Sequence, residues 1–239
     1  MKNWEYSPAR DLELSHRERV VSFKRESGLG GKLVYRFAWW LLRCYLFTFQ
    51  RMRVKGKNLL PDTGPFILIS NHSSHLDVLA LCAVLSKSSR DQARPLAAAD
   101  TFFTNPISST LSAFLINALP LYRGHCGSHA LASIRKSVVE YGLCPIMFPE
   151  GTRSRTGKIA LFRHGIGVLV AGTAVPVVPC RIQGAFKAWP PQNRRPKIGH
   201  IEVLIGKPMY FEHIASNRQG WSKIASQLED KVRGLAPAT

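Results

Sequence analysis

The body of the chain alternates between short apolar runs and longer stretches with helical spacing of apolar residues. The apolar runs predict strands at residues 65–69, 95–99, 119–122, 144–148, 175–181 and 201–205. The helical patterns cover residues 76–85, 107–117, 128–141, 165–172 and 221–235. Strands separated by helices predict an α/β fold with a mixed, largely parallel sheet flanked by helices. Residues 187–199, rich in Pro, Arg, Lys, Asn and Gln, predict a loop, and no repeat or linker divides the body.

A different pattern precedes the body. Residues 33–49 are the most apolar stretch, and as a helix they would span about 25 Å, less than the hydrocarbon core of about 30 Å. Arg36, Arg43 and Gln50 recur every seven residues, which places them in one narrow polar stripe among aromatic residues. Four cations follow at once, Arg51, Arg53, Lys55 and Lys57. This combination is typical of an amphipathic helix in a membrane interface.

Residues 33–49 allow two placements other than an interfacial helix. A helix packed on its own domain stays open as an alternative. A full membrane span is disfavoured because Arg36 and Arg43 would both lie at membrane depth. We therefore expect residues 1–57 to form a basic membrane-associating segment, peripheral or monotopic on the cytoplasmic face, and residues 58–239 to form the α/β domain.

The composition narrows the class of partner. Hydrophobic residues make up 45% of the chain, which excludes wholesale disorder, and the formal net charge is +18. Such a charge favours a polyanionic partner: nucleic acid, an anionic membrane or a phosphorylated substrate. The cations do not follow a helix-turn-helix, RNA-recognition or zinc-finger pattern, so we expect no nucleic acid partner. Five scattered cysteines without a CxxC pair, and an N-terminus without an apolar signal region, favour a reducing, cytosolic compartment.

The first candidate for chemistry is the segment Ser70–Asp77, which follows a predicted strand directly. Loops at the carboxyl ends of strands carry the sites of α/β folds. His72 and Asp77 are too far around a continuous helix to meet, but in a strand–loop–helix turn they can. The carboxylate would then accept the Nδ1 proton of His72 and leave Nε2 free to act as a base.

Three other interpretations of this segment stay open. Ser74 and Asp77 fit a capping box with Asp in place of Glu, a purely structural role. His72, His75 and Asp77 could be metal ligands, although the spacing does not complete a known ligand set and we expect no metal. A nucleophilic serine is disfavoured because the chain has no GxSxG elbow.

The second candidate is Phe148–Arg155, again after a predicted strand. A glycine, two hydroxyls and two guanidiniums in one turn suit a phosphate group. Arg123 and Arg163 lie at two further turns of the predicted sheet. Three arginines on one edge of a sheet would form a phosphate pocket.

Together these blocks resemble the glycerolipid acyltransferase family, whose best-known members are the 1-acylglycerol-3-phosphate acyltransferases. The resemblance spans roughly residues 65–207 and rests on four blocks: Asn71-His72-xxxx-Asp77, Leu121-Tyr122-Arg123-Gly124, Phe148-Pro149-Glu150-Gly151-Thr152-Arg153-Ser154 and Val175-Pro176-Val177-Val178-Pro179. It implies that His72 is the general base and Asp77 its orienting partner. It implies an acceptor site formed by Asn71, Arg123, Glu150, Gly151, Thr152, Arg153 and Arg163, the last standing where many relatives have Lys. Pro176 and Pro179 are implied to shape the substrate channel, or are simply strand-edge prolines.

The expected reaction is O-acylation of a lysophospholipid. The family resemblance implies that the free hydroxyl, most plausibly that of lysophosphatidate, attacks the thioester of an acyl-CoA or acyl-acyl carrier protein. No cofactor, metal or acyl-enzyme is expected; the partners are the lysophospholipid, the acyl donor and an anionic membrane surface. Two alternatives stay open: another acceptor, such as a lyso-ornithine lipid, or a non-catalytic basic protein that binds membranes or nucleic acid.

Overall fold

A computed structural model describes residues 11–15, 18, 22, 29–98, 109, 116–121 and 127–235. Its centre is a seven-stranded sheet with the strand order β1-β7-β6-β2-β5-β3-β4. The strands are β1 (Arg53–Lys55), β2 (Ile67–Ser70), β3 (Ala93–Ala98), β4 (Leu119–Leu121), β5 (Cys144–Met147), β6 (Val177–Gln183) and β7 (Glu202–Ile205). β2 pairs in parallel with both β5 and β6, and the antiparallel pair is β6 with β7. The sheet is therefore mixed and largely parallel, as predicted.

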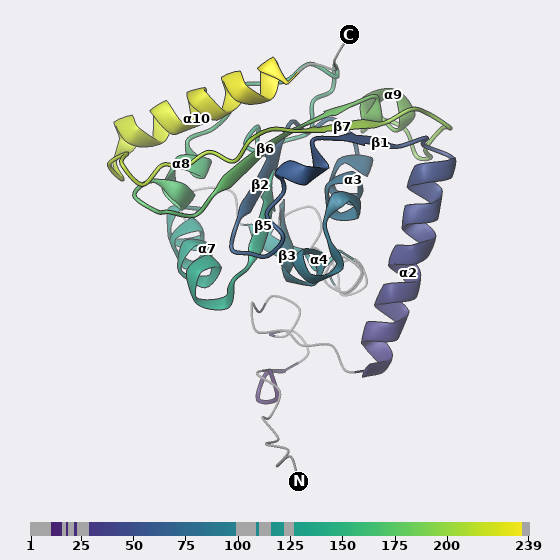
Figure 1. Cartoon of the computed structure of the whole chain (residues 1–239), viewed down its shortest axis with the longest axis horizontal. Helices are drawn as coiled ribbons and strands as arrows, with labels where there is room; N and C mark the ends of the chain where they lie inside the picture. Colours follow the sequence, from purple (N-terminus) through teal and green to yellow (C-terminus); the bar gives the residue numbers. More distant parts are fainter. Residues whose placement is uncertain are drawn as a thin grey trace.

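Helices cover both faces of this sheet (Figure 1). The pleat of β2 shows the division: Leu68 points into one core cluster, whereas Ile67 and Ile69 point into the other. The first cluster includes residues of α2 (Leu29–Thr48), α3 (Leu76–Val84) and α9 (Ala185–Ala188). The second includes residues of α7 (Gly127–Tyr141), α8 (Gly165–Val170) and α10 (Arg218–Gly234). The fold class expected from the alternation of strands and helices is confirmed.

Three local expectations differ from the structure. Strand β1 was not predicted; it lies inside residues 1–57 and pairs with β7. The polar helix α4 (Lys87–Gln92) was not predicted because it has no apolar periodicity. The helix expected at 107–117 lies mostly outside the described residues, and its last two residues are not helical.

Helix α2 lies along the flank of the body (Figure 1) and packs on it through one face, where Trp39 and Leu46 are buried. Two of the three residues of the predicted polar stripe, Arg43 and Gln50, contact the body. The Arg43 guanidinium donates to the Ala83 carbonyl at 2.8 Å. Gln50 lies beyond the helix end and is buried. The opposite face of α2 is left exposed and apolar, with Leu33, Val34, Phe37, Trp40, Leu41 and Phe47. Among the helices in the described ranges, none is both long and apolar enough to cross a bilayer.

Candidate active site

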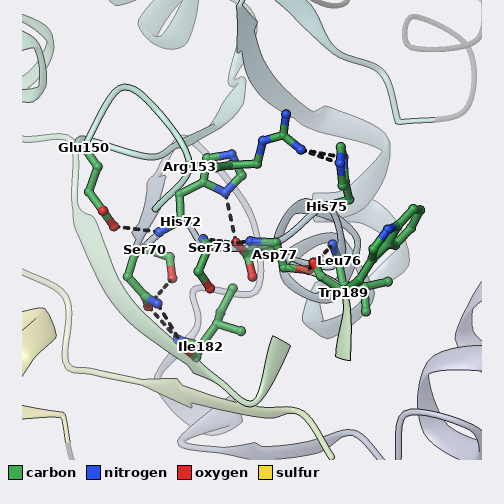
Figure 2. Close-up of polar contacts among 12 residues, drawn as sticks. Ser70, His72, Ser73, His75, Leu76, Asp77, Glu150, Arg153, Ile182 and Trp189 are labelled. Carbon is green, nitrogen blue, oxygen red and sulfur yellow. Dashed lines mark hydrogen bonds and ion pairs between the residues drawn. The ribbon is translucent and has the colours of Figure 1, made fainter. Parts of the chain in front are cut away.

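The turn between β2 and α3 brings together the two residues that the sequence singled out. His72 Nδ1 lies 2.9 Å from Asp77 Oδ2, because the chain leaves β2, makes a short loop and reverses into α3 (Figure 2). Asp77 is fully buried, whereas the His72 side chain is 17% exposed. Nδ1–H therefore donates to a buried carboxylate, and Nε2 is left for a proton from outside. The predicted pairing of His72 with Asp77 is present.

The same carboxylate oxygen also starts helix α3. The backbone N–H groups of Ser73 and Ser74 donate to Asp77 Oδ2 at 2.6 and 2.7 Å. The Ser74 hydroxyl accepts from the N–H of Leu76 at 3.1 Å. Contacts of both the capping and the orienting interpretation are therefore present, because three donors converge on one oxygen.

The loop after β5 holds His72 from the other side. The imidazole stacks on Phe148 with ring centroids 4.0 Å apart. The backbone N–H of His72 donates to Glu150 Oε1 at 2.7 Å. The backbone carbonyl of His72 accepts from the Ser154 N–H at 2.8 Å. Glu150 Oε2 also accepts from the N–H of Ala160 at 3.0 Å. Burial raises the pKa of Glu150 above its ordinary value, while these backbone donors oppose the rise.

Two of the predicted acceptor-site residues have framework contacts. Glu150 is 2% exposed and connects two loops through both of its oxygens. The Asn71 amide donates to the Ile182 carbonyl at 3.0 Å and accepts from the Ile182 N–H at 2.8 Å. Because its amide is engaged at both ends and the side chain is buried, Asn71 joins β2 to β6. The polar groups of both side chains are therefore engaged in contacts within the protein.

Arg153 extends from the loop after β5 over the start of α3 and meets His75 there (Figure 2). Its Nη1 is within hydrogen-bond reach of both ring nitrogens of His75, 2.8 Å from Nδ1. Burial, and next the charge of Arg153, lower the pKa of His75 below its ordinary value. A neutral His75 accepts a hydrogen bond from the guanidinium and so orients it.

A second guanidinium lies beside the same loop. Gly151 has φ +74°, and a Cβ there would lie 3.0 Å from Arg163 Nε, so a glycine lets the Arg163 side chain pass closely. The Arg163 N–H donates to the Pro149 carbonyl at 2.9 Å. Arg163 and Thr152 are both exposed. Two of the three predicted phosphate-binding arginines, Arg153 and Arg163, therefore lie at this turn, and Arg123 lies outside the described residues.

The two prolines of the fourth block lie at the sheet. Pro179 is buried in β6, beside Ile69 of β2, and its carbonyl accepts from the Gly206 N–H at 2.8 Å. The carbonyl of Pro176 accepts from the N–H of Ile67 at 2.9 Å. Since β6 lies between β7 and β2, Pro179 is not a strand-edge proline. Within the described ranges, no group of three His, Cys, Asp or Glu side chains is placed to hold a metal ion.

One contributor to the site was missed in the sequence. The Ser74 hydroxyl donates to the Trp189 carbonyl at 2.7 Å, across 115 residues of chain. The Trp189 ring lies 4.9 Å from the ring of His75. Trp189 stands in the segment expected to be a plain loop, and an aromatic residue there carries no local signal of such a contact.

Comparison with known proteins agrees with this architecture. The model of the acyltransferase family matches residues 51–183. A chloroplastic 1-acyl-sn-glycerol-3-phosphate acyltransferase, BAT2 of Brassica napus, is 29% identical over 168 residues, 69% of this chain and 47% of that protein. The alpha form of the same enzyme from Mus musculus is 28% identical over 68% of this chain and 56% of that protein. The chain thus spans about half the length of the curated relatives it matches.

A solved structure shares the fold. The 1-acyl-sn-glycerophosphate acyltransferase PlsC from Thermotoga maritima superimposes with a TM-score of 0.66, covering 87% of this chain and 83% of that one. Its sequence is 22% identical. The likeness therefore concerns the arrangement of the strands and helices.

Proposed function

The chain belongs to the acyltransferase family, and on that premise we propose that it is a membrane-associated O-acyltransferase that converts lysophosphatidate to phosphatidate. The observation that carries the proposal is the contact between His72 Nδ1 and the buried Asp77 carboxylate. The names of the relatives, 1-acyl-sn-glycerol-3-phosphate acyltransferases, support the choice of acceptor.

In the proposed reaction the free hydroxyl of the acceptor attacks the carbonyl carbon of an acyl thioester. His72 Nε2 takes the hydroxyl proton as the new C–O bond forms. Asp77 holds the imidazole in the tautomer with Nδ1 protonated and stabilises the imidazolium. When the tetrahedral intermediate collapses, the C–S bond breaks and the thiol leaves with the proton that His72 returns. The acyl group passes directly to the lipid, from acyl-CoA or an acyl-acyl carrier protein.

The acceptor is recognised through its phosphate. Arg153, oriented by His75, extends from the loop beside His72, and the Arg163 side chain lies along Gly151 of the same loop. Guanidinium groups pair with phosphate oxygens in bidentate geometry. This charge favours lysophosphatidate over a lyso-ornithine lipid, which has no phosphate.

We propose that the exposed face of α2 rests in the membrane interface. Phe37 and Trp40 are 62% and 60% exposed on that face. A helix with one face packed on the protein and an aromatic face turned outward suits monotopic binding.

The reaction is tested by product analysis. The purified protein is incubated with lysophosphatidate, a lyso-ornithine lipid and other lysolipids, each with acyl-CoA or an acyl-acyl carrier protein, and products are identified by mass. We expect phosphatidate. His72→Ala should lower turnover by about 10²–10⁴-fold, the range of a positioned general base. Exposed His213, changed to Ala, is the control.

Two results would reject the proposal. The first is acylation by the His72→Ala variant at the wild-type rate. The second is a wild-type product from the phosphate-free acceptor in preference to phosphatidate.

A further inference from the structure

Residues 189–199, here the bridge segment, contact the active site at their first residues. The Trp189 carbonyl accepts from the Ser74 hydroxyl at 2.7 Å, and its ring lies against His75. Gln192 donates through Nε2 to the Arg155 carbonyl at 3.2 Å. The bridge segment therefore forms part of the rim beside the His72–Asp77 pair.

The last residues of the bridge segment contact the end of α2. Gln50 donates to the Lys197 carbonyl at 2.8 Å, and the Gly199 N–H donates to the Phe49 carbonyl at 3.3 Å. Figure 1 shows the segment after α9 running to the C-terminal end of α2. One stretch of chain thus joins the rim of the site to the helix that we propose lies in the membrane.

The surface of the bridge segment combines cations with an apolar side chain. Arg194, Arg195 and Lys197 are exposed, and in the part of the chain that the structure describes none of the three forms an ion pair. The segment contains no acidic residue. Ile198 is 69% exposed, and Phe49, whose carbonyl contacts the segment, is 54% exposed. Exposed apolar side chains therefore stand on both segments where the bridge segment meets the end of α2.

We propose that the bridge segment is a second membrane contact, in which Arg194, Arg195 and Lys197 bind the headgroups of anionic phospholipids and Ile198 enters the interface. The inference rests on the proposed function. Charge complementarity favours an anionic surface. Exposed Ile198, in the stretch that contacts the end of α2, favours a lipid surface over a soluble polyanion such as a carrier protein or nucleic acid. The contact would hold the mouth of the site at the bilayer, where a lysolipid resides.

Vesicle binding tests the contact. The full chain is sedimented with phosphatidylcholine vesicles that contain or lack phosphatidylglycerol. Each cation near an anionic surface strengthens binding roughly fivefold, so Arg194→Gln with Arg195→Gln should weaken binding to the anionic vesicles about thirtyfold. The matched control is Arg218→Gln with Lys223→Gln, an equal loss of exposed charge on α10, which lies on the other side of the body (Figure 1).

The apolar part has its own pair of variants. Ile198→Glu should weaken binding to both kinds of vesicle. Val139→Glu, which changes an exposed apolar residue of α7, should not weaken it. Thermal melting followed by circular dichroism checks that each variant is folded. If Ile198→Glu does not fold, Ile198→Ser is the milder substitution.

An activity assay separates this inference from the proposed function. With a short-chain, monomeric lysolipid the bridge variants should turn over at the wild-type rate, and with acceptor in anionic vesicles they should be slower. Equal loss of binding in the α10 control would overturn the inference, and so would an altered KM for the acyl donor in the monomeric assay. If the wild-type protein acylates nothing but the selective loss of vesicle binding remains, the proposed function fails and the contact stands.

Discussion

Asp77 Oδ2 accepts hydrogen bonds from His72 Nδ1 and from two backbone N–H groups, those of Ser73 and Ser74. The two backbone donors hold the carboxylate oxygen that His72 Nδ1 contacts. Because the carboxylate is buried, its charge acts on the imidazolium with little screening by water. One side chain therefore both starts a helix and orients the proposed base.

Asp77→Asn should separate these two tasks. The amide keeps the size of the side chain but loses the charge that stabilises the imidazolium, so kcat should fall on the order of 10³–10⁴-fold. The weaker cap should cost about 1 kcal/mol of unfolding free energy. Steady-state kinetics and thermal melting measure the two effects. Added to His72→Ala, the same change should lower turnover little further, since the pair acts as a unit; full additivity would contradict the shared role.

Arg153 is expected to act in binding the acceptor. Arg153→Ala should raise the KM for lysophosphatidate with a smaller change in kcat, because it removes binding made in the ground state. Lys158→Ala, an exposed cation of the same loop, is the control. Unchanged acceptor KM in Arg153→Ala would exclude Arg153 from the phosphate site.

His75 should make that binding sensitive to pH. Its pKa is lowered, so it stays neutral at pH 7 and gains a proton only in more acidic solution. Protonation removes the acceptor for Arg153 and places a second positive charge beside it, so the KM for the acceptor should rise as the pH falls below the ordinary pKa range of histidine. His75→Asn removes this contribution, while the other ionisable side chains of the turn, His72 and Asp77, are unchanged. Identical pH profiles of KM in the two proteins would contradict the role of His75.

At the scale of elements, α8 and α10 pack without room for a side chain at Gly167. A Cβ there would meet the backbone of Trp221, so two helices distant in sequence approach at a glycine. The contact supports the layer of helices behind β2, on whose carboxyl end the site is built.

Gly167→Ala should therefore destabilise the protein. Overpacking of this kind costs about 1–3 kcal/mol, measured as the change in unfolding free energy in urea. Gly30→Ala in α2, where nothing lies within 4 Å of a Cβ, should be neutral or stabilising by up to about 1 kcal/mol. Equal effects of the two substitutions would contradict the close approach of α8 and α10.

The elements also show which predictions a local pattern can support. The strand expected at 144–148 is β5, Cys144–Met147, because a buried strand is a continuous apolar run. β1 was missed because Arg-Val-Lys carries no such run and becomes a strand by pairing with β7. A helix was predicted over residues 33–49, and α2 is present there, but the face that meets the body depends on partners such as Ala83.

At the scale of the whole molecule, the site belongs to several separate segments. The turn after β2, the loop after β5 and the bridge segment meet at one end of the sheet. The net charge of +18 acts over the entire surface and would draw the protein toward any polyanion. Charge alone thus gives attraction, whereas the apolar face of α2 would give the orientation.

Binding to membranes should therefore have two components with different salt dependence. Phe37→Glu with Trp40→Glu removes apolar contact, so binding to vesicles should be lost even in high salt, where the electrostatic part is already screened. Sedimentation at low and high salt measures both parts, with Val139→Glu as the control. Wild-type binding in high salt by the α2 variant would contradict the proposed placement of α2.

The local sequence by itself determined the alternation of strands and helices, the family, and the pairing of His72 with Asp77, because each depends on residues close together in the chain or on a motif. Tertiary structure alone decided which face of α2 is exposed, that Asn71 joins β2 to β6 through Ile182, and that Trp189 reaches His75. The physical reason is that these contacts join residues far apart in the chain. They form once the sheet order places those segments side by side, and a pattern of neighbouring residues carries no record of that order.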